Sequence, residues 1–517
     1  MAGVDLEKFR LRRFVDHLIG IGEVEIHDRP VALANISAII EGSPKATLFK
    51  DAGPEHFEIV GAVGGSRRRY AQAFGTSDER NLAQEFGRRM STSQAVVEVP
   101  QADAPVQQVV IAGDDVDLAR LPFHMQHHYD GAPYLSSAID YSIDPKTGRR
   151  NVGCRRLMLR SRNTMLSNLT QVSDLKRVFL ECVERGEHLH LNFAVGSHPL
   201  DFLAACVRAP VEDEFVTVAS VRGASLPMTK GVSNGLPVPA DAELVIEGYF
   251  DKAGYTEIEG PYGEFLGYYG PAHIDPVFHV TAITMRKDVL HQTVLHGAVK
   301  IARTEHSHQC AILTEARIRQ VLGAAKINAI AVYAVPSASG LLHARVSVRR
   351  EPPGQARAAI AKLFEIPFLK HVYMLDEEVD VFADEEVEWA FANRFRADRD
   401  LVTVPGQMAF PMDVTAGEDR TTTKAGFDLT GPLAKGGVEA KTTHAPRIDG
   451  SPRYQTVEQA LGARSMHFAE LMTSLGSNDG REIAMELDRL RRSGALSRSK
   501  DGEWTLKQRD SAAPTAR

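Results

Sequence analysis

The sequence predicts an α+β protein built from several domains. Its 517 residues exceed what one hydrophobic core usually supports and correspond to about three domains. Residues 105–300 are rich in short β-branched runs, and residues 305–445 alternate helical and strand patterns. We therefore expect an N-terminal α/β segment, a β-rich segment, a C-terminal α/β segment and an extra tail. Their predicted ranges are 1–104, 105–304, 305–446 and 447–517.

The N-terminal segment begins with a predicted helix. Residues 5–20 repeat apolar positions at helical spacing, with Asp5 as the N-cap and Gly20 as the stop signal. Short strands and another helix are expected after it. Residues 61–70, GAVGGSRRRY, are Gly-rich and basic, but they lack the Gly-Lys-Ser/Thr ending of a phosphate-binding loop. We interpret that stretch as a structural turn.

The middle segment is predicted to be a β-rich barrel or sandwich. Its apolar runs, which include YLSSAIDYSID, FVTVASVRG and AELVIEGYFD, are short and bounded by Gly, Pro, Asp or Asn. Such runs are typical of strands in all-β architectures. One helix is expected near residues 173–185.

The C-terminal α/β segment is predicted from alternating patterns. EARIRQVLGAA and GQARAAIAKLFEI have helical spacing, whereas INAIAVYAVP and KHVYMLDEEVD favour strands. Residues 414–446 are polar and rich in Gly and Thr, so we expect a loop or lid there rather than core.

The tail is predicted to hold a helix followed by a hairpin. Residues 477–479 can cap the helix, Gly494 can end it, and Trp504 lies in the hairpin. The apolar residues expected on one face of the helix are Ile483, Leu487 and Leu490. This pattern resembles a winged-helix unit, and an accessory packing or oligomerisation element is the alternative. Residues 509–517 are expected to be disordered.

Charge and cysteine usage exclude several classes of protein. The net charge is −7, which argues against a nucleic-acid-binding body because phosphate contacts need clustered cations. The four cysteines form no CxxC pair, so we expect reduced thiols in a cytoplasmic protein. The N-terminus lacks the apolar stretch of a secretory signal, and no run of about 18 apolar residues predicts a membrane span.

Two histidine-rich stretches invite a metal-site interpretation. They are HMQHHYDG, with His124, His127 and His128, and EHSHQC, with Glu305, His306, His308 and Cys310. Neither has the HExxH or paired CxxC spacing of zinc sites, so we favour surface or core histidines. The sequence also contains no GxSxG elbow and no GxGxxG after a strand.

Two acids flank a tight bend in the stretch IEGPYGEFLGYY. Glu259 and Glu264 lie on either side of Gly-Pro-Tyr-Gly, where Pro fixes φ and Gly tolerates positive φ. Such a turn allows both acids to face one cavity. The alternative is a solvated hairpin tip.

A pair of arginines lies on a predicted strand of the same segment. Arg155 and Arg156 are neighbours, so only one of them can face inward from a strand. An inward guanidinium needs an anionic partner, such as a substrate carboxylate or Glu259. The alternative is an exposed pair that contacts surface acids.

The ordered segments resemble the UbiD family of (de)carboxylases, which use prenylated flavin mononucleotide. The resemblance runs through YLSSAIDYSIDPKTGRRNVGCRR, DEFVTVASVRG, MTKGVSNGLPVPADAELVIEG, EGPYGEFLGYYG and KAGFDLT, and it covers residues 5–430. It implies a split β-barrel that binds the flavin and a C-terminal oligomerisation domain. The tail lies outside the resemblance.

The resemblance implies a specific set of site residues. The catalytic residues would be Arg156, Glu259 and Glu264. The cofactor-binding residues would be Asn151, Cys154, Arg155, Arg156, Glu214 and Lys424, with Asn151 and Glu214 also holding a divalent metal, Mn or Mg, on the flavin phosphate. A monovalent K⁺ is a further implied ion. Many family members carry a His about twenty residues after the Asn, and this chain has QVSD at residues 171–174, which leaves the third metal ligand open.

We therefore expect reversible, non-oxidative decarboxylation of an aromatic, heteroaromatic or α,β-unsaturated acid. In this interpretation Glu264 donates the proton, while Glu259 stays ionised against Arg156. The implied partners are a small aromatic acid, CO2, a flavin prenyltransferase that supplies the cofactor and further copies of the chain, as a dimer or hexamer. The alternatives are a degenerate flavin-binding protein and an aromatic-acid sensor with a DNA- or partner-contacting tail.

Overall fold

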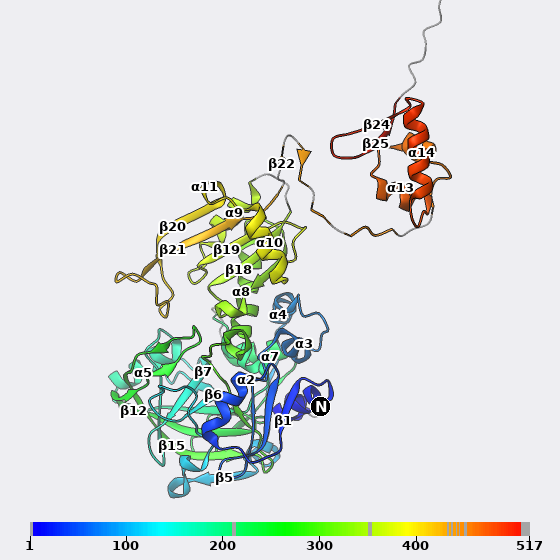
Figure 1. Ribbon diagram of the computed structural model, residues 1–517. Coiled ribbons are helices and arrows are strands. Elements are labelled where there is room, and N and C mark those ends of the chain that lie inside the picture. The colour runs from blue at the N-terminus through cyan, green and yellow to red at the C-terminus, as the bar shows by residue number, and fades with distance from the viewer. Residues whose placement is uncertain are drawn as a thin grey trace, which may run out of the picture. The chain divides into compact units, whose positions relative to one another are not determined.

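The chain separates into two compact units, Met1–Thr430 and Gly431–Arg517 (Figure 1). The computed structural model describes residues 4–208, 213–349, 354–431, 434–435, 438–440, 442–443, 445–448 and 452–507. The stretch 509–517, expected to be disordered, lies outside these residues. The four-part division expected from the sequence stays a prediction.

A closed barrel forms the centre of the first unit. Its strands are β6 (Tyr134–Ile143), β7 (Arg150–Leu159), β8 (Thr164–Ser167), β9 (Leu189–Val195), β12 (Leu244–Glu259) and β15 (His273–Met285). Their order is β12-β9-β6-β7-β8-β15, and β12 pairs with β15 to close the ring, while β5 (Val109–Ala112) extends the sheet beside β15. Phe193, Phe250 and Phe278 pack edge to face in its buried core. Of the two architectures that the strand pattern allowed, the barrel is therefore confirmed.

Three helices accompany the barrel strands, and one of them corrects the strand expected at FVTVASVRG. These helices are α5 (Asp174–Glu184), α6 (Pro199–Ala205) and α7 (Glu214–Arg222). The Asp213 side chain accepts the Phe215 and Val216 N–H groups, and Gly223 ends α7 at a φ of +68°. Because α7 is buried nearly all round, its apolar run has no helical stripe and resembles a buried strand.

The N-terminal part of this unit combines a mixed sheet with four helices. The sheet is β1 (Val24–His27), β2 (Ala46–Ala52), β3 (Phe57–Gly61) and β16 (His291–Thr293), and the helices are α1 (Leu11–Gly20), α2 (Ile36–Gly42), α3 (Arg67–Phe74) and α4 (Leu82–Met90). Asp5 is not the N-cap of α1, which begins after Arg10. Within residues 61–70, the Ser66 side chain caps α3. The segment is thus a turn into a helix.

Two pairings cross the predicted boundary between the first two segments. β16 lies in the range 105–304 and pairs with β3 of the N-terminal sheet. β4 (Val96–Glu98) pairs with β10 (Leu226–Lys230), which also pairs with β11 (Pro237–Pro239). The N-terminal sheet is therefore completed by a strand from far along the chain.

The C-terminal α/β part is a five-stranded sheet with helices, and it corrects the predicted loop at 414–446. The strands, in order, are β17 (Ala329–Ala334), β18 (His343–Val348), β19 (His371–Leu375), β21 (Thr421–Asp428) and β20 (Leu401–Met408). The helices are α8 (Glu305–Ala324), α9 (Gln355–Leu363), α10 (Asp384–Arg394) and α11 (Ala397–Asp400). β21 lies between β19 and β20, so part of the polar stretch is an interior strand.

Within its described residues, the second unit contains a short pair of strands, three helices and a terminal hairpin. Its elements are β22 (Ala434–Lys435), β23 (Val438–Glu439), α12 (Val457–Ala463), α13 (Phe468–Leu475), α14 (Arg481–Arg492), β24 (Leu496–Arg498) and β25 (Trp504–Leu506). Ile483, Leu487 and Leu490 of α14 are buried, as their spacing predicted, and Met466 bridges to Trp504. The winged-helix resemblance stays a prediction.

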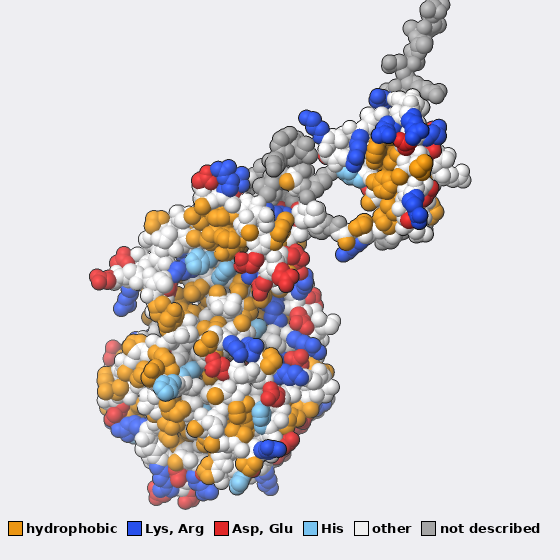
Figure 2. All heavy atoms as spheres, in the orientation of Figure 1, with side chains coloured by type: hydrophobic (Ala, Val, Ile, Leu, Met, Phe, Trp, Pro, Cys, Tyr) orange, Lys and Arg blue, Asp and Glu red, His pale blue; other side chains and the backbone are white. Residues whose placement is uncertain are grey.

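Surface charge on the visible face of the first unit is mixed. Figure 2 shows acidic and basic side chains interspersed there, with no large field of one sign. This pattern is consistent with the modest net charge of −7. Within the described residues, no helix is both long enough and apolar enough to cross a bilayer.

Candidate active site

The bend after β12 brings the two predicted acids to one place. β12 ends at Glu259, and the next short strand, β13 (Tyr262–Gly263), pairs with β14 (Tyr269–Gly270). Gly260 takes a φ of +83°, which a residue with a Cβ rarely adopts. The bend is held by Gly131, whose N–H donates to the Pro261 carbonyl at 2.8 Å. A Cβ at Gly131 would lie 2.2 Å from the Gly260 oxygen, so this close approach requires glycine.

Arg156 of β7 contacts both acids. Its Nε and Nη2 donate to the two Glu259 oxygens at 3.0 and 3.1 Å, and its Nη1 donates to Glu264 Oε1 at 2.5 Å. The Glu259 side chain is 0% exposed and that of Glu264 is 13% exposed. We call Arg156, Glu259 and Glu264 the acid–guanidinium network. A solvated hairpin tip does not describe this buried arrangement.

Aromatic side chains complete the surroundings of the network. The Arg156 guanidinium carbon lies 4.5 Å from the centroid of the buried Tyr262 ring, a cation–π contact. Tyr134 Oη donates to Glu259 Oε1 at 2.9 Å. Burial lowers the pKa of Arg156, but the carboxylates of Glu264 and Glu259 outweigh that effect and raise it, so the guanidinium stays charged. Three donors from two residues therefore bond to Glu259, whereas Glu264 has one bond to Arg156.

His273 and Asp275 adjoin the network, and the sequence did not single them out. Glu259 of β12 is paired directly with His273 of β15. The His273 Nδ1 atom lies 3.8 Å from Glu259 Oε2 and 2.5 Å from Asp275 Oδ2. Asn168 Oδ1 accepts the Thr170 N–H, so the Asn168 amide nitrogen donates to His273 Nε2 at 3.0 Å. The neutral ring consequently carries its hydrogen on Nδ1, toward Asp275. Only the pairing of distant strands places these groups together.

The same three groups could hold a metal ion by proximity alone. The ligand atoms of Glu259, His273 and Asp275 lie within 4.8 Å of one another. Two ligands of one ion with bonds near 2.1 Å stand about 3 Å apart or more. The 2.5 Å between His273 Nδ1 and Asp275 Oδ2 is a hydrogen-bond distance. The two atoms make a close ion-pair contact without the angles of a hydrogen bond, and their spacing is too short for two ligands of one ion, so this cluster does not fit a metal.

The two predicted metal ligands lie around the start of β7. The Asn151 amide nitrogen donates to Asp140 Oδ2 at 3.1 Å and to Ser142 Oγ at 3.3 Å. The Asn151 side-chain oxygen is therefore the atom that remains to bind a metal ion. Glu214 Oε2 accepts the Val152 N–H at 2.7 Å. Asn151 Oδ1 and Glu214 Oε1 accept no hydrogen bond from the described residues. Oxygen donors of this kind suit Mg²⁺ or Mn²⁺.

An acid stands near Glu214, in the stretch 171–174, where the family resemblance leaves the third metal ligand open. Gln171 is exposed, whereas Asp174 Oδ2 lies 3.5 Å from Arg149 Nη2, and Glu214 Oε1 lies 4.0 Å from the same nitrogen. Burial raises the pKa of Glu214, and the carboxylates of Asp140 and Asp174 raise it further. Asp174 and Glu214 therefore face the same Arg149 nitrogen, whereas the Gln171 side chain is exposed.

The other predicted cofactor-binding residues are distributed over two faces of β7 and a distant strand. Arg155 Nε donates to the buried Asp140 at 2.7 Å, on the face opposite Arg156, as strand alternation requires. Cys154 shares the Arg156 face and contacts α6. Lys424 of β21 is 2% exposed, and its ammonium donates to the Phe364 and Ile366 carbonyls at 2.8 and 2.6 Å. Of its three hydrogens, these two bonds leave one for another acceptor.

Both histidine-rich stretches supply packing residues. In α8, Glu305 and His308 are buried, and burial lowers the pKa of His308 to about 3. His124 is buried and its ring contacts the Pro122 carbonyl at 2.9 Å. His127 contacts Asp130, whose Oδ1 also accepts the Gly263 N–H at 2.9 Å. Of these residues, His127 and Asp130 therefore support the bend that carries Glu264.

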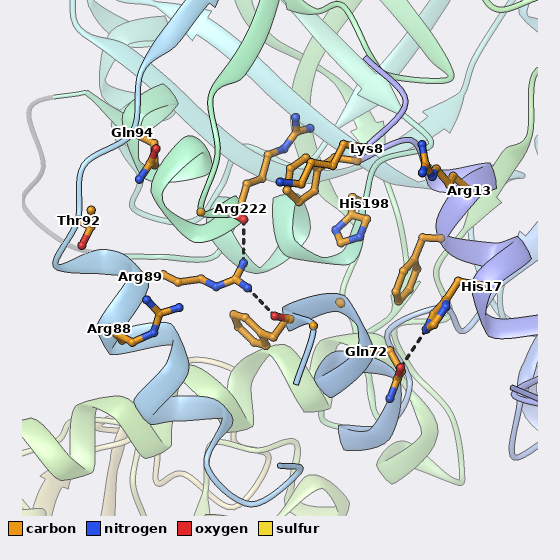
Figure 3. Close-up of a pocket in the computed structure, with 16 residues that line it drawn as sticks. Lys8, Arg13, His17, Gln72, Arg88, Arg89, Thr92, Gln94, His198 and Arg222 are labelled. Atoms are coloured by element: carbon orange, nitrogen blue, oxygen red, sulfur yellow. Dashed lines mark hydrogen bonds between the residues drawn. The ribbon is translucent and has the colours of Figure 1, made fainter. Parts of the chain in front are cut away.

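A pocket of about 530 Å³ opens elsewhere in this unit (Figure 3). It is lined by five Lys or Arg residues and by no Asp or Glu, but its inner arginines already have partners. Arg222 pairs with Asp201 and Asp241, and Arg89 donates to the backbone carbonyls of Phe74 and Arg222. No member of the acid–guanidinium network lines it. We therefore place the candidate chemistry at the network.

Two family models match the first unit. Residues 97–299 match the 3-octaprenyl-4-hydroxybenzoate carboxy-lyase Rift-related domain of UbiD. Residues 307–429 match the C-terminal domain of the same carboxy-lyases. The two matches together contain the network and all the other predicted site residues.

Similar proteins and structures agree with these models. The anhydromevalonate phosphate decarboxylase of Methanosarcina mazei is 31% identical over 318 residues, which cover 61% of this chain and 72% of that protein. The same-named enzyme of Methanothermobacter thermautotrophicus is 27% identical over 82% of this chain and 97% of that protein. The UbiD-class enzyme HmfF from Pelotomaculum thermopropionicum, solved in complex with FMN, is 29% identical with a TM-score of 0.79 over 84% of this chain and 97% of that chain. An evolved dimeric form of HmfF, solved with prFMN, has a TM-score of 0.74 at 28% identity over 82% of this chain and 96% of that chain. The chain belongs to the UbiD family of carboxy-lyases.

Proposed function

We propose that this carboxy-lyase catalyses the reversible, non-oxidative decarboxylation of an aromatic, heteroaromatic or α,β-unsaturated carboxylic acid with prenylated FMN. The observation that carries the proposal is the buried acid–guanidinium network, in which one Arg contacts two Glu at hydrogen-bond distance. Support for the cofactor comes from HmfF, which was solved with FMN and with prFMN. The intact network argues against a degenerate flavin-binding protein.

The residues divide the chemical work between them. Prenylated FMN supplies the electron sink that ordinary side chains lack when CO2 leaves an unsaturated carbon. Arg156 holds Glu259 as the anion and orients the substrate carboxylate. Glu264, with a single hydrogen bond to Arg156, gives the proton to the carbon that has lost CO2. Burial of all three side chains keeps bulk water away from the reacting atoms.

The residues around β7 fit the requirements of the cofactor phosphate and its metal. Asn151 and Glu214 each offer a carbonyl or carboxylate oxygen that accepts no hydrogen bond from the described residues, which suits Mn²⁺ or Mg²⁺. Cys154, Arg155 and Arg156 follow on the same strand and would line the flavin. Lys424 is the weaker candidate for a phosphate contact, because it is buried on β21 and already donates to two backbone carbonyls. K⁺ is the expected monovalent ion.

Asp174 is our candidate for the third metal ligand. Asp174→Asn removes one negative charge from a cluster that also contains Glu214 and Asp140, so we expect Mn²⁺ affinity to fall about tenfold or more. Titration of the FMN-loaded protein with Mn²⁺, followed by electron paramagnetic resonance, measures this affinity directly. Glu184→Gln, at an exposed acid that ends the same helix, is the matched control. Equal affinity in both variants would remove Asp174 from the site.

His273 should make stability depend on pH near the network. The Asp275 carboxylate, whose Oδ2 lies 2.5 Å from His273 Nδ1, raises the pKa of His273 above its ordinary 6.5, and the charge of Glu259 adds a smaller contribution. The resulting stability is fully present below the unfolded-state pKa and is lost as pH rises through the folded-state pKa. The melting temperature of wild type should therefore lie above that of His273→Gln at pH 6. This difference in melting temperature should be about 2 °C smaller at pH 9. Asp275→Asn should show the same change, and a pH-independent difference in both variants would contradict the assignment.

The decisive test is co-expression of the chain with a flavin prenyltransferase. The purified protein should carry the modified flavin and exchange labelled CO2 into at least one acid from a panel of aromatic, heteroaromatic and α,β-unsaturated acids. Protein expressed without the prenyltransferase is the control and should not exchange CO2. A flavin-loaded protein that exchanges CO2 into none of these acids would refute the proposed reaction.

We also propose that the enzyme works as a homo-oligomer. HmfF exists in an evolved dimeric form, and the C-terminal α/β part is the segment that the family resemblance assigns to oligomerisation. Light scattering on the purified protein should give a mass of at least two chains of 56.7 kDa. A mass of one chain would contradict this expectation.

A further inference from the structure

Two cysteines lie in contact beside the predicted flavin-lining strand. Cys154 belongs to β7, and Cys206 follows the last residue of α6. Their sulfur atoms are 3.6 Å apart, although 52 residues separate them in the chain. The structure holds both as free thiols. The fold has therefore brought two thiols together that no sequence motif pairs.

The other interactions of the two thiols are weak. Cys154 Sγ lies 3.7 Å from the Phe202 carbonyl oxygen and Cys206 Sγ lies 3.7 Å from Gln309 Oε1, so each thiol can donate its one hydrogen there or to the other sulfur. Thiols are poor hydrogen-bond donors, so these contacts cost little to break. Both residues are partly exposed, whereas Cys182 and Cys310 are buried. Cys154 and Cys206 are thus the two most solvent-exposed of the four cysteines.

We propose that Cys154 and Cys206 form a reversible intramolecular disulfide when the protein meets hydrogen peroxide. The Cys206 thiol gives up its proton and the thiolate attacks one peroxide oxygen. The O–O bond breaks, the departing hydroxide takes up that proton and leaves as water, and a sulfenic acid remains. The Cys154 thiol then attacks that sulfur, the S–O bond breaks, a second water leaves and the S–S bond forms. The two sulfurs lose two electrons in total, and the peroxide gains them. A dithiol reductant reverses the reaction.

The geometry favours Cys206 as the attacking group. The hydrogen bond from Cys154 lowers the pKa of Cys206, which outweighs the opposing effect of burial. An S–S bond measures about 2.05 Å, so the sulfurs must approach by roughly 1.5 Å. β7 is paired with β6 and β8 on its two sides, whereas Cys206 lies beyond the end of a seven-residue helix. We expect the end of α6 to move more than the strand.

The disulfide would be linked to the active site through β7. Cys154 is two residues from Arg156 and lies on the same face of the strand. Val152, on that face too, donates its N–H to Glu214. Misplacement of a catalytic group by about 1 Å can cost on the order of 10²-fold in rate. Oxidation should therefore lower decarboxylation, a consequence that rests on the proposed function.

Peptide mapping tests the disulfide without any activity measurement. After treatment of the full-length protein with hydrogen peroxide, blocking of free thiols and trypsin digestion, residues 151–155 and 186–208 should appear joined. Dithiothreitol should separate them. Residues 178–185, which contain Cys182, should remain blocked as a free thiol throughout. Recovery of 151–155 and 186–208 only as separate peptides would overturn the proposal.

Two variants complete the experiment. Cys206→Ser should yield no joined peptide, and its decarboxylation should resist peroxide, while Cys182→Ser should behave as wild type. Melting temperatures within a few degrees of wild type exclude misfolding as the cause. If the joined peptide forms but no acid exchanges CO2 under any condition, the proposed function fails and the disulfide stands. If decarboxylation proceeds and no joined peptide forms, the disulfide fails alone.

Discussion

Glu264→Gln should lower kcat by about 10²–10⁴-fold while the flavin content stays unchanged. The amide has almost the same shape as the carboxyl group, but it cannot give a proton to the substrate carbon. Glu264 has one hydrogen bond to Arg156, whereas Glu259 receives two from Arg156 and one from Tyr134. The variant should therefore keep the buried ion pair and lose only the proton donor. Steady-state decarboxylation rates and the flavin absorbance of the purified variant measure the two effects separately.

Glu257→Gln is the matched control for this variant. Glu257 lies on β12 two residues before Glu259, is 41% exposed and pairs with Arg160 at the surface. Its substitution should change kcat less than twofold, because exposed ion pairs contribute about 0–1 kcal/mol. A Glu264→Gln enzyme with full activity would refute the assignment of the proton donor.

The acids of the network were predictable because the signal is local. The Gly-Pro-Tyr-Gly turn separates Glu259 from Glu264 by five positions, and turn chemistry depends on those few residues. Arg156 was one of two candidates, Arg155 and Arg156, and strand alternation could not decide between them. The structure decides, because Arg155 pairs with the buried Asp140 on the opposite face.

The residues that contact the network from other strands could not be predicted from local sequence patterns. His273 meets Glu259 through the register of β12 and β15, and Tyr134 reaches it from β6. The register of a closed barrel depends on every strand in the ring, so no single segment specifies it. The closeness of Cys154 and Cys206 likewise follows from packing α6 against β7.

Two errors in the predicted elements have a common physical cause. FVTVASVRG forms α7, and residues 421–428 form β21 rather than a loop. α7 is buried on nearly all sides, so tertiary packing removed the amphipathic stripe that marks a helix. β21 has Thr, Lys and Gly in an interior position, where Lys424 is satisfied by two backbone carbonyls instead of water. In both cases the surrounding structure outweighed local propensity.

Arg156→Lys should lower kcat/KM on the order of 10³-fold even though the positive charge remains. One guanidinium contacts Glu259 through two nitrogens and Glu264 through a third, a fork that an ammonium cannot reproduce. A lysine at this position can satisfy one acid and leaves the other misoriented. Arg156→Ala is a less informative variant, because a buried charge that loses its partner costs about 3–5 kcal/mol of stability.

Arg160→Lys is the control, since Arg160 follows β7 and pairs with the exposed Glu257. Measurement of kcat, KM and flavin affinity for both lysine variants separates two roles of Arg156. A loss confined to flavin affinity, with normal turnover of the loaded enzyme, would make Arg156 a binding residue rather than a catalytic one. The other outcome is a lower kcat for Arg156→Lys at full flavin occupancy, with Arg160→Lys unaffected. Charge, fold and cofactor content are then the same in both variants, so the loss shows that catalysis needs the contact of three Arg156 nitrogens with the two acids.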